Sequence, residues 1–183
     1  MRAALSLGLF AILSLGGGRV AAATPTDTVS TATRVETRGK LEALLTTYAK
    51  TLGFRRWYRS DDNPFAIQMF YDRDLRYASQ LEIVINVTRQ NTIGFRVFPH
   101  WESPGPGDYI DLDQARDPQG LMQEALRLSE QNFMFWALDG SHDLFAGFTI
   151  TLESGFPEAA VRVVLESVPL VDDSVGDLLR YAE

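Results

Sequence analysis

The chain has 183 residues, a length that suits a single domain once its ends are trimmed, and 45% of them are hydrophobic, enough to bury a sizeable core. Its 24 acidic residues outnumber its 17 lysines and arginines, and the formal net charge of −7 argues against nucleic acid or an anionic membrane surface as a partner. The absence of cysteine excludes disulfides, thiolate metal sites and cysteine nucleophiles.

Residues 1–23 have the pattern of a secretory signal peptide. Arg2 supplies the positive start, and Ala3 to Leu15 form an apolar segment that is too short to span a bilayer. Small residues at 21–23 provide a cleavage site, and an uncleaved anchor or an amino-terminal core helix is the alternative. We therefore expect an exported protein, periplasmic or secreted, that has no stable membrane insertion after cleavage.

Residues 24–33 are rich in Thr and Ser and predict a flexible leader, because they offer too little apolar surface to offset the entropy lost on ordering. Residues 34–183 are expected to form the folded domain. Its first element is an amphipathic helix over Arg34–Leu52, in which Leu41, Leu45 and Tyr48 share one face.

The segment FRRWYR, residues 54–59, is the basic cluster of an acidic chain. Arg56, Trp57 and Tyr58 combine the residue types that are enriched at binding hot spots, so they are candidate binding residues. The structural alternative is an edge strand or loop whose rings cover the end of the first helix.

Three strands are predicted next, over Phe65–Tyr71, Tyr77–Thr88 and Thr92–Phe98, because apolar and polar residues alternate in each run. In the second strand Leu81, Ile83 and Ile85 point inward and Glu82 points outward. Short polar turns between the runs indicate an antiparallel meander with one packed face and one partly wet face.

The irregular segment His100–Asp113 adds two aromatic candidates for binding, Trp101 and Tyr109. Its acidic residues resemble a calcium-binding loop, but Arg116 stands where such a loop needs glycine and Met122 where it needs glutamate. No metal site and no cofactor are therefore expected.

The second half predicts a helix that begins at Asp117-Pro118, a strand over Phe133–Leu138, a strand over Leu144–Glu153, and a helix that begins at Pro157. Phe133–Leu138 is apolar on both faces, which favours a central position in the sheet. A short closing helix with a cap at Asp172 or Asp173 follows. The fold class is α+β, an antiparallel sheet of about five strands with helices packed on it, in the order α-β-β-β-α-β-β-α.

This order resembles the YbjN family, which shares the fold of type III secretion chaperones. The resemblance rests on Asn132 at a helix-to-strand junction, on Asp139-Gly140 at the hairpin turn, and on Leu144, Phe148 and Ile150 in the last strand. It implies a secretion-chaperone-like fold and a homodimer that binds a protein or peptide, with a role in envelope stress or regulation.

No catalytic motif accompanies this pattern. Ser141-His142-Asp143 contains triad residue types, but three consecutive residues cannot adopt the triad geometry. The expected function is a non-enzymatic protein- or peptide-binding module. The alternative is a small-ligand-binding protein or an enzyme that uses the His100–Asp113 loop together with His142.

Overall fold

The computed structural model describes residues 30–182, apart from Arg56 and residues 102–108. The predicted signal peptide lies outside the described residues and stays a prediction, as does most of the predicted leader. Within the described part, the fold is an antiparallel sheet of six strands with helices packed on it, which confirms the α+β class.

The strands follow one another in space in the order β1-β2-β3-β4-β6-β5, and every neighbouring pair is antiparallel. Their bounds are β1 Tyr58–Arg59, β2 Ala66–Tyr71, β3 Gln80–Val87, β4 Thr92–His100, β5 Phe135–Leu138 and β6 Leu144–Thr151. The prediction of about five strands omitted β1. Its pairing with β2 confirms the edge-strand alternative for Tyr58 and Arg59.

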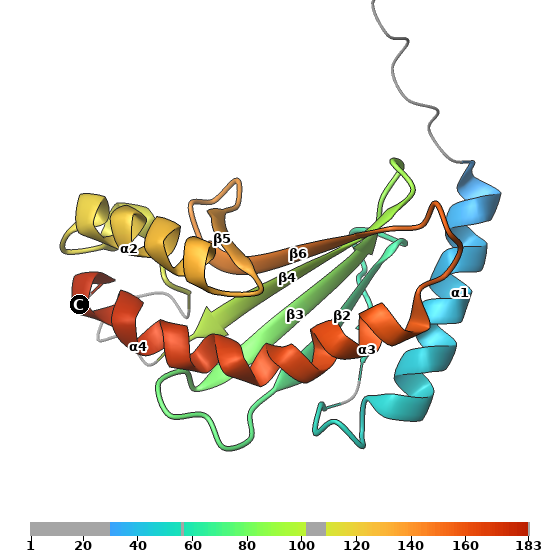
Figure 1. Cartoon of the computed structure of the whole chain (residues 1–183), viewed down its shortest axis with the longest axis horizontal. Helices are drawn as coiled ribbons and strands as arrows, with labels where there is room; N and C mark the ends of the chain where they lie inside the picture. The colour runs from blue at the N-terminus through green and yellow to red at the C-terminus, as the bar shows by residue number, and fades with distance from the viewer. Residues whose placement is uncertain (1–29, 56, 102–108, 183) are drawn as a thin grey trace, which may run out of the picture.

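The helices are α1 Thr31–Tyr48, α2 Pro118–Gln131, α3 Glu158–Ser167 and α4 Val171–Ala182, with short 3₁₀ turns η1 at Leu112–Gln114 and η2 at Val168–Leu170. Figure 1 shows α3 and α4 running across the sheet, with α1 at one end and α2 at the other. Contacts of α3 with β6 and of α4 with β4 place this pair on one face of the sheet.

The core lies between that face and the helices. Leu81, Ile83 and Ile85 of β3 are fully buried there, and so are Leu41 of α1 and Leu121 of α2. Burying a side chain of this size stabilises the fold by about 1.5–3 kcal/mol relative to leaving it exposed, so the alternating pattern fixes which face of each strand meets the helices.

The predicted position of the Phe133–Leu138 run was wrong. It forms β5, which is an edge strand, and the observed order places β6 between it and β4. Helix α2 contacts this strand, and the backbone N–H of Trp136 donates to Oγ of Ser129 in that helix at 2.7 Å. Phe133 and Phe135 are 51% and 45% exposed, so apolar residues on both faces of the run do not require a central position.

Two helix boundaries also differ from the prediction. Helix α1 begins at Thr31, because Oγ of Ser30 accepts a hydrogen bond from the backbone N–H of Thr33 at 3.2 Å. The closing helix α4 has 12 residues, and Pro169 lies in the 3₁₀ turn that joins it to α3 without a loop. The first turn of a helix tolerates proline, which is why Pro169 redirects the chain without ending the helical run.

Candidate functional site

The face of the sheet turned away from the helical layer is the part of the molecule where polar and aromatic residues gather. We call it the open face. It carries the outward residues of the central strands, whose neighbours along each strand point into the core. These outward residues are Gln68, Phe70, Glu82, Val84, Asn86, Gly94, Arg96, Phe98, His100, Phe145 and Thr149.

Glu82 is the centre of a polar cluster on this face. Its carboxylate accepts hydrogen bonds from the hydroxyl of Tyr109 at 2.8 Å and from Nε2 of Gln68 at 3.1 Å, and it lies 3.1 Å from Nε2 of His100. Only 7% of Glu82 is exposed. The hydrogen bond from His100 is the main reason why the pKa of Glu82 lies below its usual range, although burial acts in the opposite direction.

Aromatic rings surround Glu82 in a continuous row. The ring centroids of His100 and Tyr109 lie 4.5 Å apart, and Phe98 contacts both Tyr109 at 5.8 Å and Phe145 at 5.4 Å. Phe70 continues the row: its ring centroid lies 6.4 Å from that of His100 and 6.2 Å from that of Tyr58. We call these six residues the aromatic band. Edge-to-face and tilted contacts of this kind stabilise the surface and leave a rigid, mostly apolar platform.

The structure brings together only two of the predicted binding residues. Tyr58 and Tyr109 both belong to the aromatic band, and the pKa of the Tyr58 hydroxyl is raised by its partial burial and then by the nearby Glu82 carboxylate. A binding role for either residue stays a prediction.

The other predicted binding residues lie elsewhere. Trp57 is half-buried and packs beside Leu45 and Ala49 of α1, away from Tyr58. Trp101 is 9% exposed and belongs to the core, where its Nε1 donates to the carbonyl of Tyr109 at 3.2 Å. This burial gives Trp101 a structural role, and a binding role for it stays a prediction. Arg56 is outside the described residues.

The two histidines lie at the same end of the sheet but pair with different carboxylates. His100 contacts Glu82, whereas Nδ1 of His142 lies 2.8 Å from the carboxylate of Asp113. The segment that contains Tyr109 and Asp111 runs between the two histidines. Tyr109 forms an antiparallel β-bridge with His100, and Asp111 forms one with Asp143, the residue after His142. The hydrogen bond to Asp113 raises the pKa of the exposed His142 ring.

Acidic residues gather near this turn, but not in the form of a metal site. Asp139 uses its carboxylate to accept the backbone N–H groups of Ser141 and Asp143, which closes the β5–β6 turn. Burial and the neighbouring Asp139 raise the pKa of Asp143. Across the described part of the chain, no three His, Asp or Glu side chains gather in a way that could hold a metal ion.

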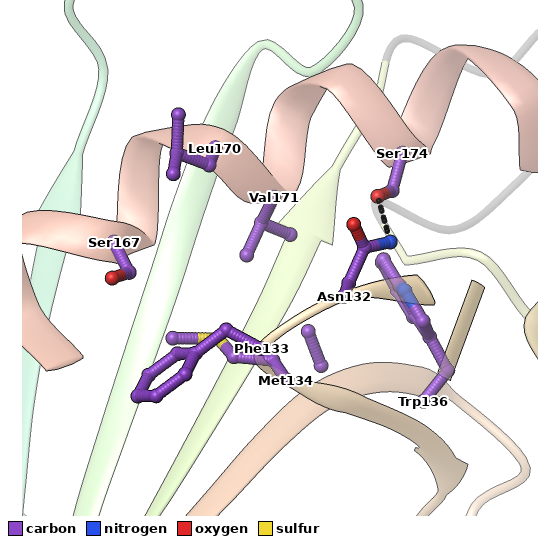
Figure 2. Close-up of a pocket in the computed structure, with 9 residues that line it drawn as sticks. Asn132, Phe133, Met134, Trp136, Ser167, Leu170, Val171 and Ser174 are labelled. Carbon is purple, nitrogen blue, oxygen red and sulfur yellow. Dashed lines mark hydrogen bonds between the residues drawn. The ribbon is translucent and has the colours of Figure 1, made fainter. Parts of the chain in front are cut away.

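A small apolar pocket lies on the helical side, between the start of β5 and the junction of α3 with α4. Figure 2 shows Phe133, Met134 and Trp136 on one side of it and Leu170 and Val171 on the other. Its volume is about 70 Å³, which suits one small apolar side chain. At its edge, Nδ2 of Asn132 donates to Oγ of Ser174 at 3.3 Å, so Asn132 ties the end of α2 to α4.

The curated relatives share one name. The chain is 31% identical over 107 residues to the G subunit of the ion-translocating oxidoreductase complex of Vibrio parahaemolyticus, an alignment that covers 56% of this chain and 47% of that protein. It is 35% identical over 102 residues to the same protein of Pasteurella multocida, covering 53% and 47% of the two chains. It is 32% identical over 111 residues to the same protein of Pseudomonas aeruginosa, an alignment that covers 58% of this chain and 49% of that protein.

The chain therefore spans about half the length of the curated relatives that it matches. No family model matches it, and no solved structure matches it. In the described part of the chain, none of the helices combines the length and the apolarity needed to cross a bilayer.

These relatives overturn three expectations. The assignment to the YbjN family was wrong, because the relatives carry a different name. The peptide-binding module with a role in envelope stress is contradicted by relatives that belong to an oxidoreductase complex, whereas its small-ligand or enzyme alternative stays a prediction. The expected partners, a homodimer with no stable membrane insertion after signal cleavage, are contradicted for the same reason, since ion translocation takes place across a membrane.

The family assignment was wrong because it relied on residues that have structural roles in this fold. The residues that carried it, Asn132, Asp139-Gly140, Leu144 and Phe148, all have structural roles here: Asn132 joins α2 to α4, Asp139 closes a turn, and Leu144 and Phe148 face the core. Such residues recur in unrelated sheets, because any hairpin beside a helix needs them.

Proposed function

We propose that this chain is a subunit of a membrane-bound ion-translocating oxidoreductase complex and that it supports electron transfer by that complex. The observation that carries this proposal is the similarity, at 30–35% identity over about half of the chain, to the G subunits of such complexes from several bacteria. The alignments involve roughly a hundred residues each, so they extend well beyond a single hairpin.

We further propose that the protein is exported and acts on the outer side of the membrane. The apolar segment Ala3–Leu15 after Arg2 supports this location. Export would place the folded domain beside the membrane complex without requiring that the folded domain itself span the bilayer.

The sequence excludes two kinds of redox centre from this chain. The 183 residues contain no cysteine and two histidines, so they cannot supply the thiolates that hold iron–sulfur clusters or the thioether links of c-type haem. We propose that the chain is not itself an enzyme and that it positions other subunits, which carry the redox chemistry.

The finer fold prediction also stays a proposal. We propose that the observed order of helices and strands corresponds to the secretion-chaperone arrangement, with β1 as an addition to the predicted elements and α4 as the predicted closing helix. Superposition of an experimental structure on such chaperones would test it: agreement over the whole sheet supports the arrangement, and a different strand order contradicts it.

The function is tested by recovering the protein with its complex. A carboxy-terminally tagged chain, produced in its own host, is purified from membranes solubilised in mild detergent, with a tagged exported protein of unrelated sequence as the control. Mass spectrometry should identify the other subunits of the oxidoreductase complex with the tagged chain and not with the control.

Gene deletion provides the functional measurement. Membranes from the deletion strain should show at least about a threefold loss of ion-translocating oxidoreductase activity, and the wild-type gene should restore it. Recovery of the tagged chain alone, together with unchanged activity in the deletion strain, would contradict the proposal.

A further inference from the structure

A polar hollow lies on the open face, between β2, β3 and β4. Its volume is about 200 Å³, and its lining includes Ser60, Asn63, Asn86 and Arg96. The hollow exists because Gly94 stands at its floor, where a Cβ atom would find no other atom within 4 Å. In register, Gly94 faces Asn86 on β3 and Thr149 on β6, so this space lies over the middle of the sheet.

The lining offers hydrogen-bond donors and contains no carboxylate. Nδ2 of Asn63 donates to Oδ1 of Asn86 at 3.4 Å, an orientation that leaves the Asn86 amide N–H groups available to a ligand. The Ser60 hydroxyl and the Arg96 guanidinium add further donors. A pocket of this composition binds an anionic acceptor and disfavours a cation.

Arg96 supplies the positive charge. Half of the arginines in the described region pair with a carboxylate, as Arg55 does with Asp72 and Arg59 with Glu42. Within that same region, the one contact found for the Arg96 guanidinium is the ring of Phe145, at 4.9 Å from its centroid. Glu82, the acidic residue of the open face, is held by Gln68, Tyr109 and His100 instead. An exposed cation in the middle of a sheet, in a chain of net charge −7, therefore remains to be neutralised.

The volume of the hollow limits the size of the anion that it can bind. Sites for drug-sized ligands and cofactors usually measure about 300–1,000 Å³, so a space of about 200 Å³ suits a single carboxylate-bearing side chain. Next to it lie the exposed Tyr58, with 41% of its surface accessible, and the rest of the aromatic band. Arginine and tyrosine beside a pocket are the usual composition of a protein interface hot spot.

We propose that this hollow receives a Glu or Asp side chain from another subunit of the oxidoreductase complex, whose neighbouring apolar residues pack on the aromatic band. The inference rests on the proposed function and adds the face and the charge by which the chain docks. Arg96 forms the ion pair, and Gly94 leaves the room for it.

Three variants of the full-length tagged chain test the docking face. Arg96→Glu reverses the charge, Gly94→Leu fills the hollow in a place where the backbone tolerates a side chain, and Arg89→Glu, at the exposed β3–β4 turn, is the matched control for the change in charge. Each is purified from host membranes, and the recovered complex is quantified.

Arg96→Glu and Gly94→Leu should lower the recovery of the complex about tenfold or more, and Arg89→Glu should leave it near the wild-type value. Circular dichroism melting checks that each variant is folded.

A photo-crosslinking residue identifies the occupant. Placed at Thr149, beside the hollow, it should link the chain to another subunit of the complex within a peptide that contains Glu or Asp. Placed at Val163, which is exposed on α3, it should not.

The outcomes separate this inference from the proposed function. If the wild-type chain recovers no complex, the proposed function fails. If the complex is recovered equally with the wild type, Arg96→Glu and Gly94→Leu, the proposed function stands and the docking face is wrong. Thermal stabilisation by inorganic phosphate or acetate that is lost in Arg96→Glu, with unchanged recovery of the complex, would also overturn it, because the hollow would then bind a small free anion.

Discussion

Glu82 illustrates how much a single outward residue can do. The alternation of β3 predicted that it points away from the core, and it does, but the prediction of a wet face did not anticipate that it would be buried. Three partners that are distant in sequence or on another strand, Gln68, His100 and Tyr109, close over it. A strand pattern reveals the direction of a side chain, whereas its burial depends on neighbours that only the tertiary fold brings near.

This burial leads to a pH-dependent prediction. Because the pKa of Glu82 is lowered in the folded state, its ionised form stabilises the protein above the pKa of the unfolded chain, about 4.3, and this contribution is lost as pH falls through the folded-state pKa. We expect Glu82→Gln to lower the free energy of unfolding by about 1–3 kcal/mol at pH 7. The difference from the wild type should shrink below about pH 4.

Urea unfolding of both proteins between pH 3 and pH 8 measures this effect. Glu153→Gln, at an exposed carboxylate beyond the end of β6, is the matched control and should change the stability little at any pH. A Glu82→Gln variant that is as stable as the wild type at pH 7 would mean that the cluster contributes nothing to folding.

Asp172 provides a second case at the same scale. The sequence predicted a helix cap at Asp172 or Asp173, and Asp172 does lie in the first turn of α4. Its buried carboxylate, however, accepts the backbone N–H groups of Arg76, Tyr77 and Ala78, at 2.6–3.1 Å for the shortest contact of each. The residue therefore secures the loop before β3 to the last helix, a contact across 94 to 96 positions that no local pattern indicates.

At the scale of the element, local patterns predicted most helices and strands but not their neighbours. The alternation of β2, β3, β4 and β6 was sufficient to assign each of them, and the stripe of Leu41 and Leu45 was sufficient for α1. The edge position of β5 was missed, because this strand carries an exposed aromatic residue, Phe135, in addition to its buried residues, as a central strand would. Strand β1 has only two residues, so it is too short to show the alternation of apolar and polar residues that identifies a strand.

Two helical glycines give a prediction at this scale. Gly39 lies in the exposed middle of α1 with nothing within 4 Å of an added Cβ, whereas an added Cβ at Gly120 of α2 would lie 2.5 Å from Cδ1 of Tyr181. Alanine favours a helix interior over glycine by about 1 kcal/mol, so Gly39→Ala should raise the free energy of unfolding by about 0.5–1 kcal/mol.

Gly120→Ala should lose that gain, because Tyr181 must move and the contact between α2 and α4 loosens. Chemical denaturation of the two variants beside the wild type compares them directly. A Gly120→Ala variant stabilised as much as Gly39→Ala would show that the packing of α2 on α4 is not close at this point.

At the scale of the whole molecule, one core cluster joins all the major elements. It includes Leu41 of α1, Ile83 of β3, Leu121 of α2, Val161 of α3 and Val175 of α4. A single cluster of this extent favours one cooperative unit across the described residues.

The three tryptophans make this cooperativity measurable, because Trp57, Trp101 and Trp136 contact the cluster from different parts of the chain. Urea unfolding followed by tryptophan fluorescence and by far-ultraviolet circular dichroism should give coincident transitions with one midpoint. Two separated midpoints would indicate that the helical layer and the sheet unfold independently.

The family, in contrast, could not be read from local patterns. Residues such as Asn132 and Asp139 satisfy requirements of the fold, and similar requirements arise in many proteins. The two candidate docking residues differ in this respect. Gly94 is unusual in a strand interior and was the signal that the sequence contained, whereas Arg96 follows the alternation as an outward residue.

The short outer strands have a further consequence for the behaviour of the protein at high concentration. β1 has two residues and β5 has four, so the sheet presents almost no free ladder of N–H and C=O groups to a second copy. Strand exchange and cross-β fibre growth both start from such a ladder. This chain should therefore resist fibril formation during prolonged agitation, even though its strands are rich in the β-branched and aromatic residues that usually promote it.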